Sequence, residues 1–130
     1  MLFITNRFPT QSIKTRVGRG FDFDLKNNAA SNSVFYCRRL DKEKYEEIGG
    51  FNLMSELKAS PYRQLLVYIH GFSNLPEAVF EGAAQLQALC DAQKKNELLV
   101  LPVVWPCDDD LGVVQDYWDD QKAADASAFS

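Results

Sequence analysis

The sequence predicts an α/β fold: a mixed sheet that begins with antiparallel strands and continues as a parallel β-α-β-α unit. Two apolar runs carry this prediction, residues 64–69 and residues 98–105, and both are typical of strands buried on both faces. Between them, residues 75–95 place apolar side chains such as Val79 and Ala83 at helical spacing. Strand, helix and strand in this order indicate a parallel sheet that is covered by helices.

The N-terminal part of the chain predicts the antiparallel strands. Residues 2–5 are a short apolar run, and residues 21–25 alternate between apolar and acidic side chains with a period of two. Small polar residues at 27–33 indicate a turn, and residues 34–40 follow it as another strand. We therefore expect residues 21–25 and 34–40 to pair with each other in an antiparallel arrangement.

A helix is expected before the first buried strand. The charged stretch at 41–50 ends in two glycines, and Phe51 to Ala59 has helical spacing, which Ser60-Pro61 interrupts. We interpret residues 1–130 as a single domain with an antiparallel entry region at 1–60 and a β-α-β-α region at 61–130.

The last part of the chain leaves the sheet with an exposed side. Pro102 cannot donate to a ladder and predicts a bulge or the end of the strand at 98–105. Capping residues at 106–110 precede a helix from about Gly112. Because no strand follows, we expect Leu98 to Trp105 to form a bare edge, which another surface must cover.

Composition limits the class of protein. The net charge is −4 with a single histidine, which argues against nucleic acid as a partner. Three cysteines without metal-type spacing indicate reduced thiols in a cytoplasmic protein, and neither a membrane span nor a cofactor motif is present. Residues 1–20 carry basic side chains and no acidic ones, which we interpret as solvated surface rather than a docking site.

The most informative stretch is the end of the strand at 64–69. The apolar run stops at His70-Gly71, and a helix entry follows, with Asn74 as its expected cap, Pro76 in its first turn and Glu77 completing a capping box. Strand, turn and helix in this order are how α/β hydrolases build the loop whose backbone N–H groups help to bind an oxyanion.

Three motifs in order give the chain a family resemblance. The first is His-Gly-aromatic-x-Asn, the second is Trp-Pro, and the third is Tyr-x-x-Asp with Ala and Ser spaced behind it. Together they resemble bacterial α/β hydrolases of unknown function that are related to serine esterases and lipases. Phe72 stands where that family usually has Tyr, and Cys107 stands where it has Ser. The residues that carry the resemblance are His70, Gly71, Phe72, Asn74, Trp105, Pro106, Tyr117, Asp120, Ala124 and Ser127.

The resemblance implies that the chain is the N-terminal half of an α/β-hydrolase fold and acts on a small ester. It implies an oxyanion loop at His70, Gly71 and Phe72, in which His70 holds the loop and the Phe72 N–H is the oxyanion donor. The side chains expected to support this loop and its helices are Asn74, Trp105, Tyr117 and Asp120.

The sequence contains no catalytic triad. A Gly-x-Ser-x-Gly nucleophile elbow does not occur in it, and there is no second histidine to act as a base. A Cys107 nucleophile is disfavoured, because the neighbouring aspartates 108–110 are expected to raise the pKa of its thiol. A metal site in the aspartate-rich segment 108–125 is also disfavoured, because this segment lacks the pattern of a calcium-binding loop.

We therefore expect the chain to be inactive alone. It would need a C-terminal half as partner or assemble as a homo-oligomer. The alternative function is a non-catalytic interaction module that self-associates or pairs with another protein through its open sheet edge.

Overall fold

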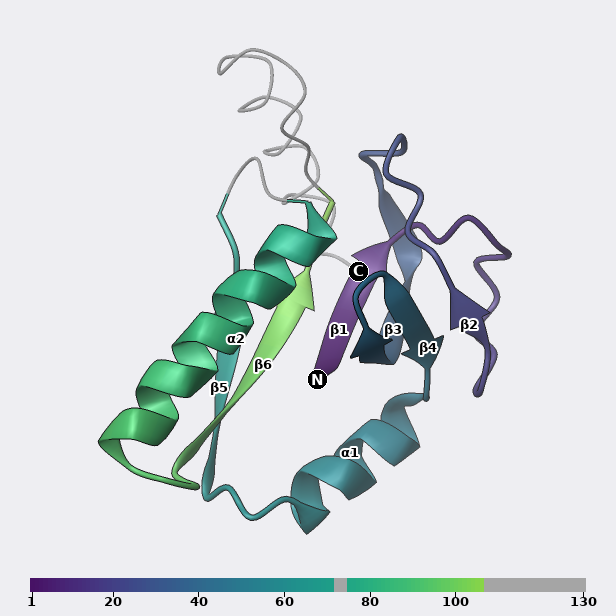
Figure 1. Ribbon diagram of the computed structural model, residues 1–130. Helices are drawn as coiled ribbons and strands as arrows, with labels where there is room; N and C mark the ends of the chain where they lie inside the picture. The colour runs from purple at the N-terminus through teal and green to yellow at the C-terminus, as the bar shows by residue number, and fades with distance from the viewer. Residues whose placement is uncertain (72–74, 107–130) are drawn as a thin grey trace.

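A computed structural model describes residues 1–71 and 75–106 and shows one mixed sheet with two helices in this part of the chain (Figure 1). The strands lie in the order β2-β4-β3-β1-β6-β5. The elements are β1 (Leu2–Arg7), β2 (Gly20–Phe21), β3 (Ala30–Asp41), β4 (Lys44–Glu47), α1 (Gly50–Ala59), β5 (Gln64–Ile69), α2 (Pro76–Gln93) and β6 (Leu98–Val104). The α/β class and the mixed sheet expected from the sequence are confirmed.

The parallel half of the sheet agrees with the sequence. β5 and β6 pair in parallel from Gln64 opposite Leu98 to Ile69 opposite Val103, and α2 connects them. β1 lies on the other side of β6 and is also parallel to it. The Thr5 hydroxyl donates to the Val104 carbonyl at 2.7 Å, which ties these two strands together.

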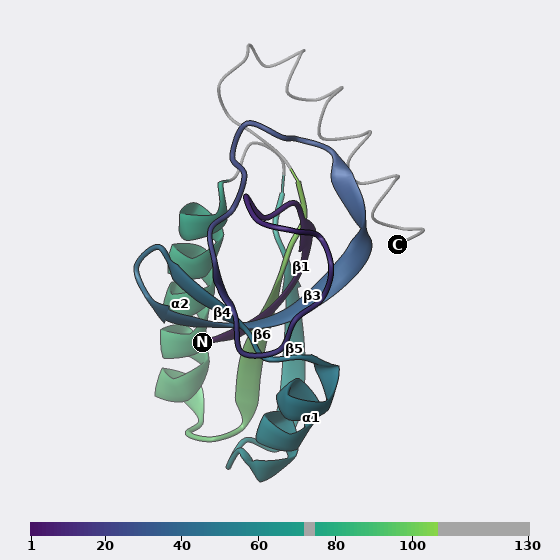
Figure 2. The same ribbon diagram turned by 90° about the vertical axis from the view of Figure 1, so that its right-hand side faces the viewer.

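The prediction of a bare edge at residues 98–105 is wrong. β6 lies inside the sheet, and β5 is the edge strand of the part that the structure describes. β5 is not buried on both faces either, because Leu65, Val67 and Ile69 are 45%, 50% and 67% exposed. A continuous apolar run gives no information about which face is covered, and here α2 packs mainly on β6. Figure 2 shows α2 along one side of the sheet and α1 low on the other side.

Pro102 does not end a strand as expected. It lies within β6, buried and opposite Tyr68 of β5, and β6 continues to Val104. The ladder between β1 and β6 begins at Val103, one residue after the proline.

The expected pairing of residues 21–25 with residues 34–40 is also wrong. β4 lies between β2 and β3 and pairs antiparallel with both. Its sequence is charged and was not expected to form a strand, yet Tyr45 and Glu47 are buried. A tight turn joins β3 to β4, with Asp41 opposite Lys44 and Glu43 at a φ of 58°. The sequence of this turn lacks a typical hairpin signal such as Asn-Gly, which is why the hairpin was not expected.

Aromatic rings form the centre of the core between the antiparallel half of the sheet and α2. Phe3 of β1 contacts Phe80 of α2, with ring centroids 4.7 Å apart, and Phe23 contacts Tyr45 at the same separation. Phe21 packs against both Phe23 and Tyr45. These contacts hold β4 and the chain after β2 against α2.

The two helices agree with their predicted positions. α1 covers the residues expected from the spacing of Leu53, although the structure buries only that residue of the helix and leaves Phe51 85% exposed. α2 ends at Gln93, two residues before the predicted end, so the expected lysines follow its last turn. A helix from about Gly112 lies outside the described residues.

Candidate functional site

The candidate site lies where the parallel strands β5 and β6 end. His70 follows β5 and Trp105 follows β6, and because the two strands run parallel in register, their carboxyl ends meet at one edge of the sheet. The structure thus brings together two of the predicted site residues, with Gly71 beside them. The other predicted site residues, Phe72, Asn74, Tyr117 and Asp120, lie outside the described residues, as does Cys107.

His70 and Trp105 make three contacts with each other. The Trp105 backbone N–H donates to the His70 Nε2 at 3.1 Å, and the indole Nε1–H donates to the His70 carbonyl at 3.0 Å. The two rings are stacked with centroids 5.0 Å apart and an interplanar angle of 8°. Both side chains are buried. The main chain after β5 is therefore fixed to the main chain after β6.

The hydrogen bonds of His70 define its tautomer. Nε2 accepts from an amide, so it carries no proton, and Nδ1 lies 2.9 Å from the Gly71 carbonyl, which can only accept. The proton of the neutral ring is consequently on Nδ1. Burial lowers the pKa of His70, because the charged imidazolium would lose its solvation. Both nitrogens of the neutral His70 ring therefore have main-chain partners, the Gly71 carbonyl and the Trp105 N–H.

The start of α2 differs from the expected capping box. Leu75 occupies the N-cap position without a side-chain cap, and Pro76 is in the first turn. The Glu77 carboxylate instead accepts two hydrogen bonds from the Arg39 guanidinium, at 2.7 and 3.1 Å, and one from the Tyr45 hydroxyl at 2.5 Å. The first turn of α2 is therefore anchored to the β3–β4 hairpin by an ion pair.

This network shifts the pKa values of its members. Partial burial works to raise the pKa of Glu77, but the hydrogen bonds from Arg39 and Tyr45 outweigh it and hold that pKa below its ordinary value. Burial, and then the hydrogen bond to the Glu77 carboxylate, raise the pKa of the Tyr45 phenol. Sequence reasoning missed this network, because its members are 32 and 38 residues apart and the β3–β4 hairpin was not foreseen.

A cavity of about 220 Å³ lies against the same elements. Leu75 and Pro76 line it from the start of α2, and Phe23, Leu25 and Tyr45 line it from the antiparallel half. Asp22, Glu43 and Glu77 also line it. The cavity thus has apolar and acidic residues in its lining, and Leu75 and Pro76 follow the predicted oxyanion loop in the chain.

Metal and thiol chemistry find no support among the described residues. Within 1–71 and 75–106, no group of three His, Cys, Asp or Glu side chains is placed to hold a metal ion, and the aspartate-rich segment 108–125 lies outside these ranges. Burial raises the pKa of the Cys37 thiol, so this cysteine is held in its unreactive protonated form. Neither of the two described helices has the length and apolar character to cross a membrane.

Comparison of the chain with models of protein families, with curated protein sequences and with solved structures found no match.

Proposed function

We propose that this protein is an α/β-hydrolase-like protein of the serine esterase or lipase type, and that the described residues carry its oxyanion-loop half. The observation that supports this most is the contact between His70 and Trp105 at the carboxyl ends of two adjacent parallel strands. Ligands of open α/β sheets bind outside these strand ends. A loop whose function is to present a backbone N–H must be held rigidly, and this contact fixes the start of the loop.

In this proposal each residue has a separate role. The backbone N–H of Phe72 donates to the oxyanion that forms when a nucleophile attacks the ester carbonyl. His70 positions that amide through Gly71 and Trp105 and transfers no proton. The cavity beside Leu75 and Pro76 takes the apolar part of a small ester, since most of its lining is hydrocarbon.

The nucleophile and the base must come from outside these 130 residues. The sequence has no Gly-x-Ser-x-Gly elbow, and its one histidine is engaged through both ring nitrogens. We therefore expect the 130-residue chain to hydrolyse a short p-nitrophenyl ester no faster than buffer. Any turnover that follows the concentration of the purified chain contradicts this assignment.

The same assay on the longest natural polypeptide that contains this sequence tests the hydrolase assignment itself. Sequencing the coding DNA beyond the codon for Ser130 identifies that polypeptide and shows whether Gly-x-Ser-x-Gly follows. We expect ester hydrolysis there, reduced by His70→Ala and kept by the matched control Tyr62→Phe, which removes only the hydrogen bond to Asp91. An intact but inactive polypeptide overturns the proposal.

The second candidate function is an interaction module. The observation that favours it is the row of exposed apolar side chains on the edge strand β5, namely Leu65, Val67 and Ile69. An uncharged edge strand is a template for pairing with another strand. Sedimentation of the chain at micromolar concentration tests this candidate, which predicts a dimer or larger species. A single monomeric species that also unfolds cooperatively above room temperature excludes the self-associating form of this module.

A further inference from the structure

The connection between β1 and β2 is held in place by a buried carboxylate. Residues 10–19 of this connection are called the basic loop, and Glu47 of β4 contacts them with 2% of its side chain exposed. The Glu47 Oε1 accepts from the Arg16 backbone N–H at 2.8 Å and from the Arg19 Nε at 3.0 Å. The Glu47 main chain also bonds the loop, through Gly18 N at 2.7 Å and Arg19 O at 2.9 Å.

Arg19 is held by several contacts, and 13% of its side chain is exposed. Its Nη1 donates to the Ser12 carbonyl, and its guanidinium lies 5.5 Å from the centre of the Phe35 ring. Within the described ranges its Nη2 makes no further hydrogen bond to protein. Burying an ion pair is a costly way to hold a loop, so the arrangement indicates that the position of this guanidinium matters.

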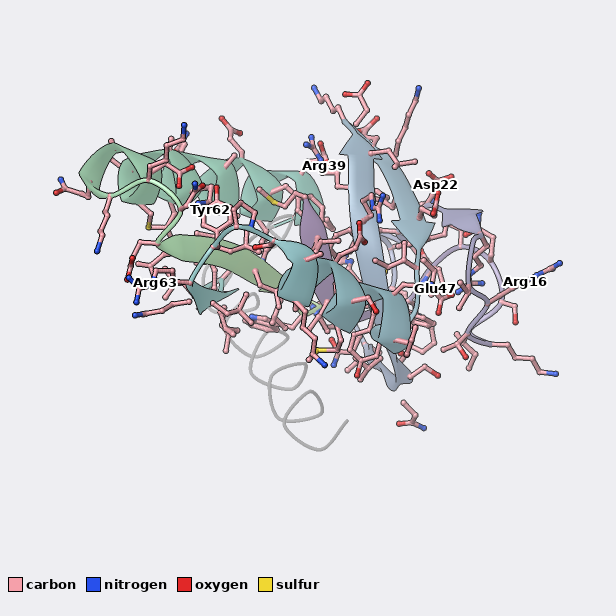
Figure 3. All side chains as sticks on the ribbon, turned by 90° about the horizontal axis from the view of Figure 1, so that it is seen from below. Arg16, Asp22, Arg39, Glu47, Tyr62 and Arg63 are labelled. Carbon is pink, nitrogen blue, oxygen red and sulfur yellow. The ribbon has the colours of Figure 1, made fainter. Side chains whose placement is uncertain are left out.

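Two further cations flank Arg19. Lys14 and Arg16 take part in no ion pair with any described residue, in a chain whose overall charge is −4. Figure 3 shows Arg16 at the outer rim of the molecule and Glu47 further inside. A cavity of about 480 Å³ lies along the loop, lined by all three cations together with Ser12 and Thr15.

We propose that the basic loop binds a small phosphate dianion, either inorganic phosphate or the phosphate of a monoester. A guanidinium presents paired N–H donors that match phosphate oxygens, and an ammonium group and hydroxyls add charge and further donors. The cavity brings these groups together without a carboxylate in its lining. This site is independent of the oxyanion loop and does not rest on the proposed ester hydrolysis.

A nuclear magnetic resonance titration of the ¹⁵N-labelled chain tests the proposal. Sodium phosphate and phenyl phosphate are added in separate arms at constant ionic strength, with sodium chloride as the balancing salt. We expect saturable shifts of the amide signals from Ser12 to Gly20 in the phosphate arm. Tighter binding of phenyl phosphate assigns the site to a monoester, and equal binding assigns it to the phosphate group alone.

A double variant and a charge-matched control make the test specific. Lys14→Ala with Arg16→Ala is expected to weaken phosphate binding at least tenfold, whereas Lys42→Ala with Lys95→Ala removes the same charge from exposed positions elsewhere and leaves binding unchanged. If both double variants weaken phosphate binding equally, the effect comes from net charge alone, and the proposed site is wrong. Shifts that chloride alone reproduces, or no saturable shift in either arm, overturn it as well.

Glu47→Gln examines the support of the loop. If this variant folds, as judged by its amide spectrum, we expect weaker phosphate binding with Lys14 and Arg16 unchanged. The neutral amide holds the Arg19 guanidinium less firmly than the carboxylate does, and this loss is expected to outweigh the gain from removing a negative charge. Unaltered affinity in folded Glu47→Gln contradicts the role given to the buried carboxylate. If it does not fold, the double variant decides alone.

Discussion

The two halves of the sheet differ in how their faces are covered. In the antiparallel half, Phe3, Phe35 and Cys37 are almost completely buried by side chains of the same half and of α2. In the parallel half, α2 packs on β6, while the edge strand β5 exposes Val67 and Ile69. The antiparallel half is therefore buried where it faces α2, whereas the edge strand of the parallel half retains an apolar surface.

The largest expected effect comes from the aromatic core of the antiparallel half. Phe3→Ala removes contacts to Phe23, Tyr45 and Phe80, and is expected to lower the free energy of unfolding by about 3–5 kcal/mol. The control is Phe51→Ala on α1, where the ring is 85% exposed and a change within about 0.5 kcal/mol is expected. Urea unfolding measures both. Similar losses in the two variants contradict the position of the core.

Next in size is the contact between the two strand ends of the parallel half. His70→Ala leaves the buried Trp105 backbone N–H without its acceptor and removes the stacked ring, which is expected to cost about 1–3 kcal/mol in the same urea experiment. Tyr62→Phe removes one partly buried hydrogen bond and should cost less. A His70→Ala chain as stable as Tyr62→Phe contradicts the stabilising role given to the contact between His70 and Trp105.

The single histidine also gives this half a pH dependence. Because burial lowers the pKa of His70 below 6.5, the unfolded chain takes up its proton at a higher pH than the folded chain does. This contribution to stability is present above pH 6.5 and is lost as the pH falls through the pKa of the folded state. The imidazole signal can be followed by NMR without ambiguity, since there is one histidine. A midpoint at or above 6.5 is incompatible with the neutral, buried ring.

A smaller effect is expected where the two halves meet. The ion pair of Arg39 with Glu77 joins the hairpin to α2 and is partly exposed, so a double-mutant cycle with Arg39→Met and Glu77→Gln should give a coupling of about 1 kcal/mol. Since the pKa of Glu77 is lowered from 4.5, this coupling is present above that value and disappears as the pH falls through the folded pKa. Glu81→Gln, at an exposed position of α2, serves as the control substitution.

The smallest effect on stability is expected at the edge strand β5. A substitution there is expected to change self-association of the chain rather than its stability. Val67→Lys is expected to alter the free energy of unfolding by about 0.5 kcal/mol or less, because the side chain is half exposed. If two copies pair antiparallel about Val67, Leu65 of each faces Ile69 of the other, and lysines at 67 meet at the centre. Sedimentation should therefore show less self-association for Val67→Lys than for the native chain. Unchanged association places the contact elsewhere.

The sequence predicted the pairing of the parallel strands correctly, but neither the pairing of the antiparallel half nor which strand faces are buried. The apolar runs of β5 and β6 predicted two adjacent parallel strands. The contact between His70 and Trp105 was not predicted, because the sequence does not show which side chains meet where the two strands end. The same runs could not show that Ile69 is exposed, because burial depends on elements that pack on the sheet and not on the strand itself.

The missed features share a physical cause. β4 carries Lys44, Glu46 and Glu47 and resembles a charged turn, but Tyr45 faces the aromatic core and Glu47 is neutralised by Arg19. A buried ion pair between residues distant in sequence leaves no local pattern. The sequence shows that residues 1–20 carry basic side chains and no acidic ones. Composition alone does not reveal that Glu47 holds this segment in place.

The contact between His70 and Trp105 also has a consequence for strand alignment. β5 and β6 are both nearly continuous apolar runs, so sliding one against the other by a residue would still place hydrocarbon beside hydrocarbon. The hydrogen bonds to the His70 carbonyl and Nε2 form only when Ile69 is opposite Val103. This polar pair at one end of the ladder thus adds a preference for one register between two strands whose apolar side chains would tolerate several.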